Sequence, residues 1–165
     1  MGRTHLFLLV LLFSFGPAVN WCSTPAFAAE IEVDELSDID FGEVPPSVGE
    51  LRSQTDFCVA LSERGNYQIS AFTSAPGGAF VLLGADNSVE RGVAFEVFVN
   101  ERGGGRGVQL FPGVPLTGLR SRERLPNGSC PRPQPQISVT IRRSELSRAK
   151  SGFYRGSLGL TVAPE

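Results

Sequence analysis

Few side chains in this sequence could do chemistry, and the scarcest of them is histidine. The 165 residues include one histidine, His5, and three cysteines, Cys22, Cys58 and Cys130. His5 and Cys22 lie in an N-terminal segment with the features of a secretory signal. Its removal would leave no histidine for a Ser-His-Asp or Cys-His arrangement, or for a zinc site built on two histidines. We therefore expect that the protein is not an enzyme.

Clustered carboxylates and a glycine run are the remaining candidates for a metal or cofactor site. The carboxylates are Glu30, Glu32, Asp34, Glu35, Asp38 and Asp40. They alternate with apolar residues, as on a half-exposed edge strand, and their spacing matches no loop that wraps a cation. Gly103, Gly104 and Gly105 precede Val108 and Leu110, which begin a strand rather than the helix that a phosphate-binding loop requires. We expect a hairpin turn there, and neither a metal nor a cofactor.

The first residues resemble an export signal. Arg3 and His5 precede an apolar run over residues 6–15, and a small-residue Ala-Phe-Ala cleavage site follows. The run is shorter than the ~20 apolar residues that a membrane-spanning helix needs. We expect residues 1–28 to be a signal peptide, residues 29–165 to form one exported domain, and no integral membrane segment to remain after cleavage.

Two cysteines, Cys58 and Cys130, remain in the expected domain. In an oxidising compartment such a pair is expected to form a disulfide. A loop of about 70 residues closed in this way would stabilise the fold by about 4 kcal/mol in the chain-entropy model. Two alternatives stay open at this point: a pair of unpaired buried thiols, and a lipid anchor at Cys22, although Val19, Asn20 and Trp21 make a poor lipidation site.

Short apolar segments with a period of two predict an all-β protein. Glycine (19) and proline (12) are abundant and separate these segments, and the formal net charge of -2 includes no basic stripe for nucleic acid. Expected strands cover residues 31–41 with a break near 37, 51–61, 67–71, 80–82, 93–99, 108–110, 137–141 and 154–162. Residues 143–150 could form a short helix. Seven or eight strands at this spacing predict a β-sandwich.

The pattern of residues 51–61 does not determine whether the Cys58 side chain points into the core or to the outside of the sheet. If Phe57 and Val59 face the core, Cys58 points to the outside of the sheet. A bulge near Asp56 would turn it inward instead.

Four segments resemble the spore coat protein U domain family. They are LSDIDFGEV (36–44), TDFCVAL (55–61), GNYQISAF (65–72) and SGFYRGSLGLTVAPE (151–165). That family has an early apolar-x-Phe-Gly element, a cysteine-bearing strand before a Tyr-x-Ile strand, and a closing Gly-x-Tyr strand. It includes secreted pilin subunits of archaic chaperone-usher systems.

The resemblance implies an incomplete immunoglobulin-like sandwich that works by subunit assembly at the cell surface. Such subunits lack a final strand, which a periplasmic chaperone lends and the N-terminal extension of the next subunit then replaces. The implied partners are this chaperone, an outer-membrane usher and other pilus subunits. The implied strand-acceptor groove lies between an early strand and the last one. Its expected residues are Ile31, Val33, Ile39, Phe41, Tyr154, Leu158, Leu160 and Val162.

Two departures from the family concern the cysteines and the N-terminus. The familiar cysteine ahead of the Phe-Gly element is absent, and Cys130 stands as the substitute partner of Cys58. Only residues 29–35 precede the first family element, too few to span a strand-length groove. We therefore expect a subunit that accepts a strand without donating one, as at a fibre tip or in a minor position. The alternative is a self-complete, monomeric secreted binding domain.

Overall fold

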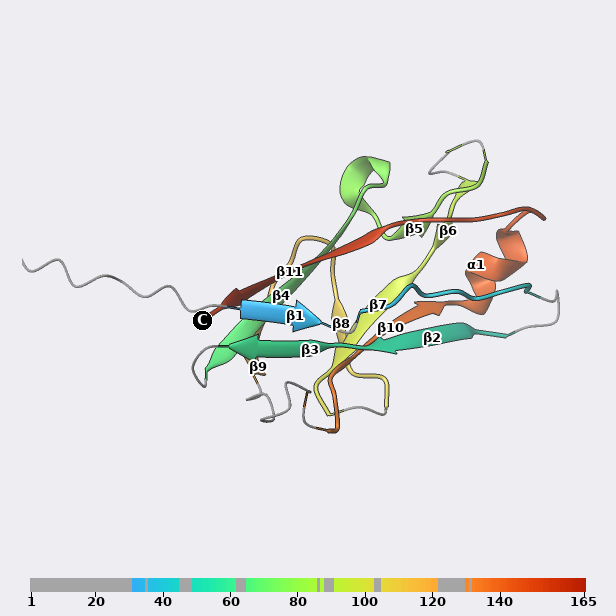
Figure 1. Ribbon diagram of the computed structural model, residues 1–165. Coiled ribbons are helices and arrows are strands. Elements are labelled where there is room, and N and C mark those ends of the chain that lie inside the picture. Colours follow the sequence, from blue (N-terminus) through green and yellow to red (C-terminus); the bar gives the residue numbers. More distant parts are fainter. Residues whose placement is uncertain are drawn as a thin grey trace, which may run out of the picture.

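A computed structural model describes most of the chain from residue 31 onward (Figure 1). The described residues are 31–34, 36–44, 49–61, 65–85, 87, 91–102, 105–121, 130 and 132–165. The expected signal peptide lies outside them, and so do Glu30, Glu35, Gly103 and Gly104.

A four-stranded antiparallel sheet forms one layer of the protein. Its strand order is β2 (Leu51–Asp56), β10 (Gln136–Ile141), β7 (Glu96–Asn100) and β8 (Val108–Leu110). The central strands β10 and β7 carry valines and isoleucines at alternate positions, which favours a strand with one face in a core. The expected strands 93–99, 108–110 and 137–141 therefore all occur, although the first is split into β6 (Val93–Ala94) and β7.

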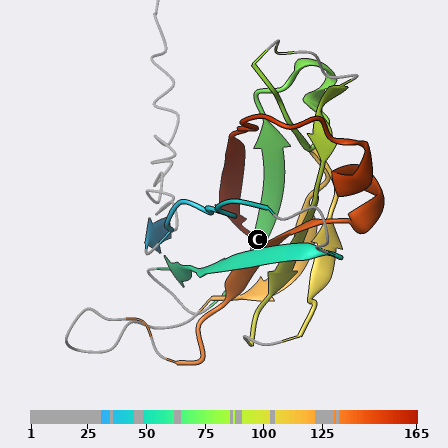
Figure 2. The same ribbon diagram turned by 90° about the vertical axis from the view of Figure 1, so that its right-hand side faces the viewer.

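A three-stranded antiparallel sheet forms the facing layer. It contains β11 (Leu158–Pro164), β4 (Asn66–Thr73) and β9 (Leu116–Arg120), with β4 in the middle. Figure 2 shows β11 in dark red beside β4 in green, with the strands of the four-stranded sheet on the other side of the core.

Two short strand pairs and two helical turns complete the described structure. β1 (Ile31–Asp34) pairs with β3 (Cys58–Leu61), and β5 (Val81–Leu82) pairs with β6. A 3-10 turn, η1 (Pro76–Gly78), precedes β5, and α1 (Arg143–Arg148) follows β10. Leu146 of α1 packs against the edge of the core, so the short helix closes one end of the sandwich (Figure 1).

The core lies between the two sheets. Both sheets contribute inward-facing residues to it, and Phe57 and Val59 join them from directly after β2 and from β3. The central members from the two sheets are Tyr67, Ile69, Ala71, Val97, Val99, Ile137, Val139 and Ile141. Phe80 and Phe95 extend it, with their rings stacked 5.5 Å apart at the centroids. The protein is therefore an all-β sandwich, as the sequence predicts.

Two expected strands differ in extent from the prediction. The expected strand 31–41 ends at Asp34, so Ile39 and Phe41 lie in non-strand chain. The side chain of Asp40 accepts a hydrogen bond from the backbone N–H of Gly42 (2.8 Å), and Gly42 has a φ of 62°, so the chain turns here. The expected last strand begins at Leu158, which leaves Tyr154 outside it.

The long expected strand 51–61 is interrupted at Phe57. β2 pairs with β10, whereas β3 pairs with β1, so the chain changes its strand partner at this residue. The backbone N–H of Phe57 donates a hydrogen bond to the carbonyl oxygen of Pro135 (2.9 Å). The two halves of the segment therefore belong to different strand pairs.

Candidate strand-acceptor groove

The last strand, β11, is hydrogen-bonded along one edge. It pairs with β4 over its whole length, from Leu158 opposite Thr73 to Pro164 opposite Tyr67. Within the described residues no strand pairs with its other edge. A strand of this kind presents a row of backbone N–H and C=O groups that can pair with another chain.

The first strand, β1, is likewise paired on one side, through its ladder with β3. Cα atoms of β1 and β11 come within 8 Å of one another, yet no ladder joins the two strands in the described part of the chain. Figure 1 shows β1 beside the end of β11, near the C-terminus, and the chain diverging from there toward α1. The two free edges therefore come close at one end of β11 and are not hydrogen-bonded to each other.

The apolar side chains of this region are half-exposed. We call it the β1–β11 seam and define it by Ile31, Val33, Ile39, Phe41, Leu158, Leu160 and Val162. All seven pack against the core, and none of them is fully buried. Their apolar surface thus remains partly open to solvent, in contrast to that of Tyr67, Ile69 and Ala71 on the adjacent strand β4.

Seven of the eight residues that the sequence predicts for this site are those that define the seam, and each is half-buried against the core. The eighth, Tyr154, is also half-buried against the core, but its hydroxyl group is engaged in the turn after α1. It donates to the carbonyl oxygen of Lys150 (3.0 Å) and lies 3.1 Å from the backbone N–H of that residue. Tyr154 therefore anchors the chain that leads into β11 and is not part of that strand.

The chain after β1 is held along β2 by a hydroxyl pair. The Ser37 and Thr55 hydroxyl oxygens lie 2.8 Å apart, and the backbone N–H of Ser37 donates to the Thr55 hydroxyl (3.2 Å). These contacts position Ile39 and Phe41 against the core without a strand ladder. The expected break near Ser37 is therefore followed by non-strand chain, and not by the predicted second half of the strand.

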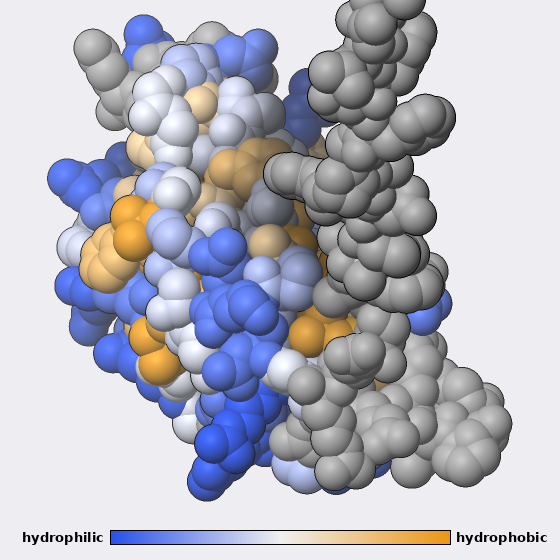
Figure 3. All heavy atoms as spheres, turned by 90° about the vertical axis from the view of Figure 1, so that its left-hand side faces the viewer, coloured by the Kyte–Doolittle hydropathy of each residue, from blue (hydrophilic) through white to orange (hydrophobic). Residues whose placement is uncertain are grey.

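The seam is uncharged on its β11 side. Leu158–Pro164 has no ionisable side chain, and Glu165 directly after it is tied back to the sheet. The Glu165 carboxylate accepts a hydrogen bond from the backbone N–H of Gly118 (2.8 Å). The backbone N–H of Glu165 donates to the backbone carbonyl oxygen of Asn66 (3.0 Å). Figure 3 shows the corresponding end of the molecule, where apolar surface appears among polar residues.

Sequence reasoning missed one exposed residue beside the seam, Phe72. It lies on β4 in the outward phase, since Tyr67, Ile69 and Ala71 face the core, and 51% of its surface is exposed. Its register partner is Gly159 of β11. The signal in the sequence is an apolar residue that breaks the alternation of its strand.

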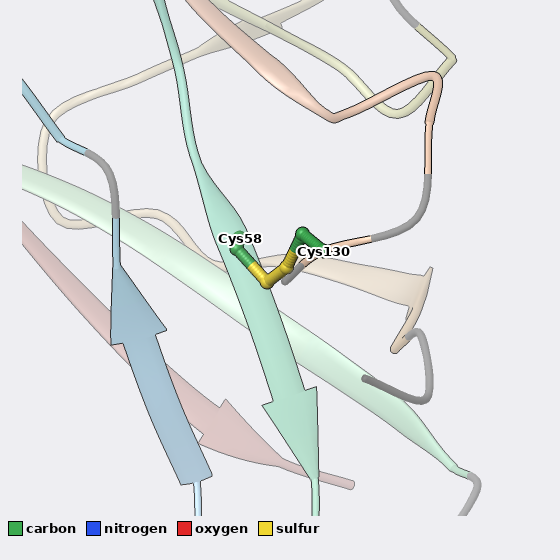
Figure 4. The surroundings of a disulfide bond; sticks show 2 residues. All are labelled: Cys58 and Cys130. Carbon is green, nitrogen blue, oxygen red and sulfur yellow. A yellow bond between two sulfur atoms is a disulfide. The ribbon is translucent and has the colours of Figure 1, made fainter. Parts of the chain in front are cut away.

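The predicted disulfide between Cys58 and Cys130 is present. It joins residues 72 positions apart in the sequence, with their Cα atoms 6.1 Å apart. Both cysteines are buried, and Cys58 is not part of the cluster that contains its neighbours Phe57 and Val59. Figure 4 shows the bond running from β3 to the segment of Cys130. Cys58 thus points away from the side of Phe57 and Val59, and the bridge fastens the segment of Cys130 to β3, which also pairs with β1.

Neither a metal site nor a membrane-spanning helix is found among the described residues. No group of three or more His, Cys, Asp or Glu side chains there could hold a metal ion. No helix there has the length and apolar character needed to cross a membrane.

Comparisons with known proteins identify a similar fold. No family model matches the sequence, and a search of curated proteins finds no match. One solved structure is described as "Chaperone-tip adhesin complex is vital for synergistic activation of CFA/I fimbriae biogenesis", and one of its chains resembles this protein with a TM-score of 0.53. The two sequences are 16% identical, and the match covers 82% of this chain and 41% of the other. The likeness shows a shared fold with less than half of that chain.

Proposed function

We propose that this protein is an exported, non-enzymatic subunit of a cell-surface pilus or fimbria that accepts a β-strand from another chain. In such strand addition, main-chain hydrogen bonds supply affinity, and pockets for alternate side chains supply specificity. The donated strand would lie in the β1–β11 seam and complete an immunoglobulin-like sandwich.

A single observation carries this proposal. β1 and β11 are each paired on one side only within the described residues, and the apolar side chains of the seam are half-exposed. An unprotected edge of this kind exposes the protein to aggregation, which natural sheets usually prevent with charges, prolines or covering segments. β11 has no charge, and its proline is at its last position. A donated strand would satisfy the backbone groups and cover the apolar surface together.

The fold comparison supports the same class of function. The similar structure is described as a chaperone and tip adhesin complex from fimbriae biogenesis. The resemblance to the spore coat protein U domain family points to the same mode of assembly. The proposed partners are a periplasmic chaperone, an outer-membrane usher and other pilus subunits, and the proposed route is export by the signal at residues 1–28, through the periplasm to the cell surface.

The proposed place in the fibre is a tip or minor position. The expected mature chain has residues 29–35 ahead of the first family element, a length too short for a donor strand. Such a subunit would receive a strand and pass none on.

The competing function is a self-complete, monomeric secreted binding domain. The observation in its favour is the approach of β1 to within 8 Å of β11, because the N-terminal segment would then cover part of the edge without a donor.

Refolding of the exported chain separates the two functions. The probe is a set of synthetic peptides, each about a dozen residues long, that alternate Val and Thr and so match a half-buried strand. A strand acceptor should aggregate or unfold at low temperature when alone, and its melting temperature should rise with peptide concentration, because the peptide binds the folded state. A stable monomer whose melting temperature does not change with any peptide would contradict strand acceptance. That result would support the self-complete domain.

A further inference from the structure

We propose that Phe72 is a specificity-determining residue that contacts one outward-facing side chain of the donated strand and favours an apolar residue there. This inference rests on the proposed strand acceptance and adds a second recognition surface to it. The seam would select the inward-facing side chains of the donor, and Phe72 would select an apolar side chain on the opposite face.

The tip of the Phe72 ring lies over β11. A Cβ atom built on Gly159 would lie 2.2 Å from Cζ, 2.3 Å from Cε2 and 2.8 Å from Cε1 of Phe72. The tip of the ring therefore fills the space in which any side chain at position 159 would stand. The absence of a side chain at Gly159 allows Phe72 to reach across the last paired strand of the sheet.

An incoming strand beside β11 would lie close to the Phe72 ring. Neighbouring strands lie about 4.7 to 4.9 Å apart, and β4 is separated from the donor position by β11 alone. With its tip already above β11, the ring of Phe72 would lie within contact distance of an outward side chain opposite Gly159. If the register partner on β11 had a side chain, that side chain would stand between the β4 residue and the donor.

The Phe72 ring is surrounded by small or polar side chains on the outer face of β4 and β11. The other outward residues of β11, Thr161 and Ala163, are short, and their partners on β4 are Ser70 and Gln68. Among the described residues of β4 and β11, Phe72 is therefore the large apolar side chain on this outer face, and it is 51% exposed. An aromatic or long aliphatic side chain from the donor would bury both partners, as cross-strand pairs do on a sheet face.

The partner is thus a strand with a recognisable pattern. Its inward positions are apolar, and its outward positions are polar except for one, which faces Gly159 and Phe72. In sequence this appears as a single apolar residue that breaks the alternation.

The test uses the exported chain and the Val/Thr peptides, with the outward Thr replaced by Phe at one position at a time. One of these peptides should bind about three- to tenfold more tightly than the parent, the gain that an aromatic pair on a sheet face supplies. Phe72→Ala should abolish that gain and leave the affinity for the parent peptide nearly unchanged. Phe72→Leu should retain part of it, and each variant's own melting curve establishes that it is folded.

Phe111→Ala is the matched control. Phe111 is similarly exposed, at 57% against 51% for Phe72. It lies next to Pro112, which forms a β-bridge to Ala71 of β4 from the segment leading into β9. It is therefore on the side of β4 away from β11, and its removal should leave the gain intact.

Three outcomes would overturn the inference. Equal binding of all peptides to the wild type would reject the role of Phe72 while strand acceptance stands. Failure of every peptide, the parent included, would reject strand acceptance itself. A loss of self-association in Phe72→Ala without peptide, seen by sedimentation, would assign this face to contact between copies of the chain.

Discussion

A Cβ atom on Gly107 would lie 2.3 Å from the backbone carbonyl oxygen of Val99. This contact is in the hairpin that joins β7 and β8, where Gly107 has a φ of 76°. Gly107→Ala should therefore destabilise the protein through both backbone conformation and a steric clash with the backbone, by roughly 2 to 4 kcal/mol.

Gly77→Ala is the control for that change. Gly77 has the same φ of 76°, but nothing lies within 4 Å of an added Cβ. Its cost should be limited to the left-handed backbone conformation, about 1 kcal/mol. Chemical denaturation measures both variants, and equal losses would mean that the close approach of Gly107 to Val99 is not tight in solution.

The disulfide provides a second prediction. Breaking the Cys58–Cys130 bond, which closes a loop of 72 residues, should lower the free energy of unfolding by about 4 kcal/mol. The double variant Cys58→Ser, Cys130→Ser should show this loss in denaturant without any reductant. Mass analysis of exported wild-type protein should find no thiol that alkylates before reduction. Two alkylated thiols would contradict the bridge.

Two phenylalanines with opposite exposure provide a third prediction. Phe95 is 7% exposed and stacks on Phe80, so Phe95→Ala should cost about 3 to 5 kcal/mol through lost burial and a cavity. Phe153 is 97% exposed, and Phe153→Ala should change stability by no more than about 0.5 kcal/mol. If the two variants melt at the same temperature, Phe95 is not in the core.

Alternation predicts the strands of the core because each of them has one buried face. Tyr67, Ile69 and Ala71 alternate with more polar residues, and all three are fully buried. The same pattern locates β10 and β7. In these segments the burial of one face and the local sequence favour the same structure, so the sequence is sufficient to predict where the strands lie.

Alternation fails where the backbone is irregular. The alternation does not predict β9, because its apolar residues Leu116 and Leu119 are three positions apart and Gly118 between them has a φ of 75°. Its pairing with β4 shifts register between Tyr67 and Ile69, so an irregular strand still fits the sheet. A sequence pattern with a period of two contains no signal for such a strand.

For the same reason, the sequence pattern predicts the strand on the β11 side of the seam but not the conformation of the chain after β1. The alternation of Leu158, Leu160 and Val162 is regular and locates one side of the seam. Ile39 and Phe41 also alternate, but the turn at Asp40 and Gly42 and the hydroxyl contacts of Ser37 prevent a strand there. The interruption at Phe57 depends on a bond to Pro135, a residue distant in the sequence, which no local pattern encodes.

The last prediction tests the β11 side of the seam directly. Leu160 faces the core from β11 and is half-exposed, whereas the next residue, Thr161, is exposed on the opposite face. Leu160→Arg would place an unpaired charge where a donated strand must pack, so we expect it to abolish stabilisation by the Val/Thr peptides and to reduce recovery with a cognate chaperone.

Thr161→Arg introduces the same charge one residue away and should leave peptide binding within about twofold of the wild type, since an outward position of an exposed sheet face tolerates a long charged side chain. Leu160→Ala should weaken binding to an intermediate degree without introducing a charge, which separates lost packing from charge burial. Melting-temperature shifts over a peptide titration measure all three variants. If Leu160→Arg and Thr161→Arg respond to the peptides alike, the donor does not pack against the inward face of β11, and the strand-acceptor groove is wrongly placed.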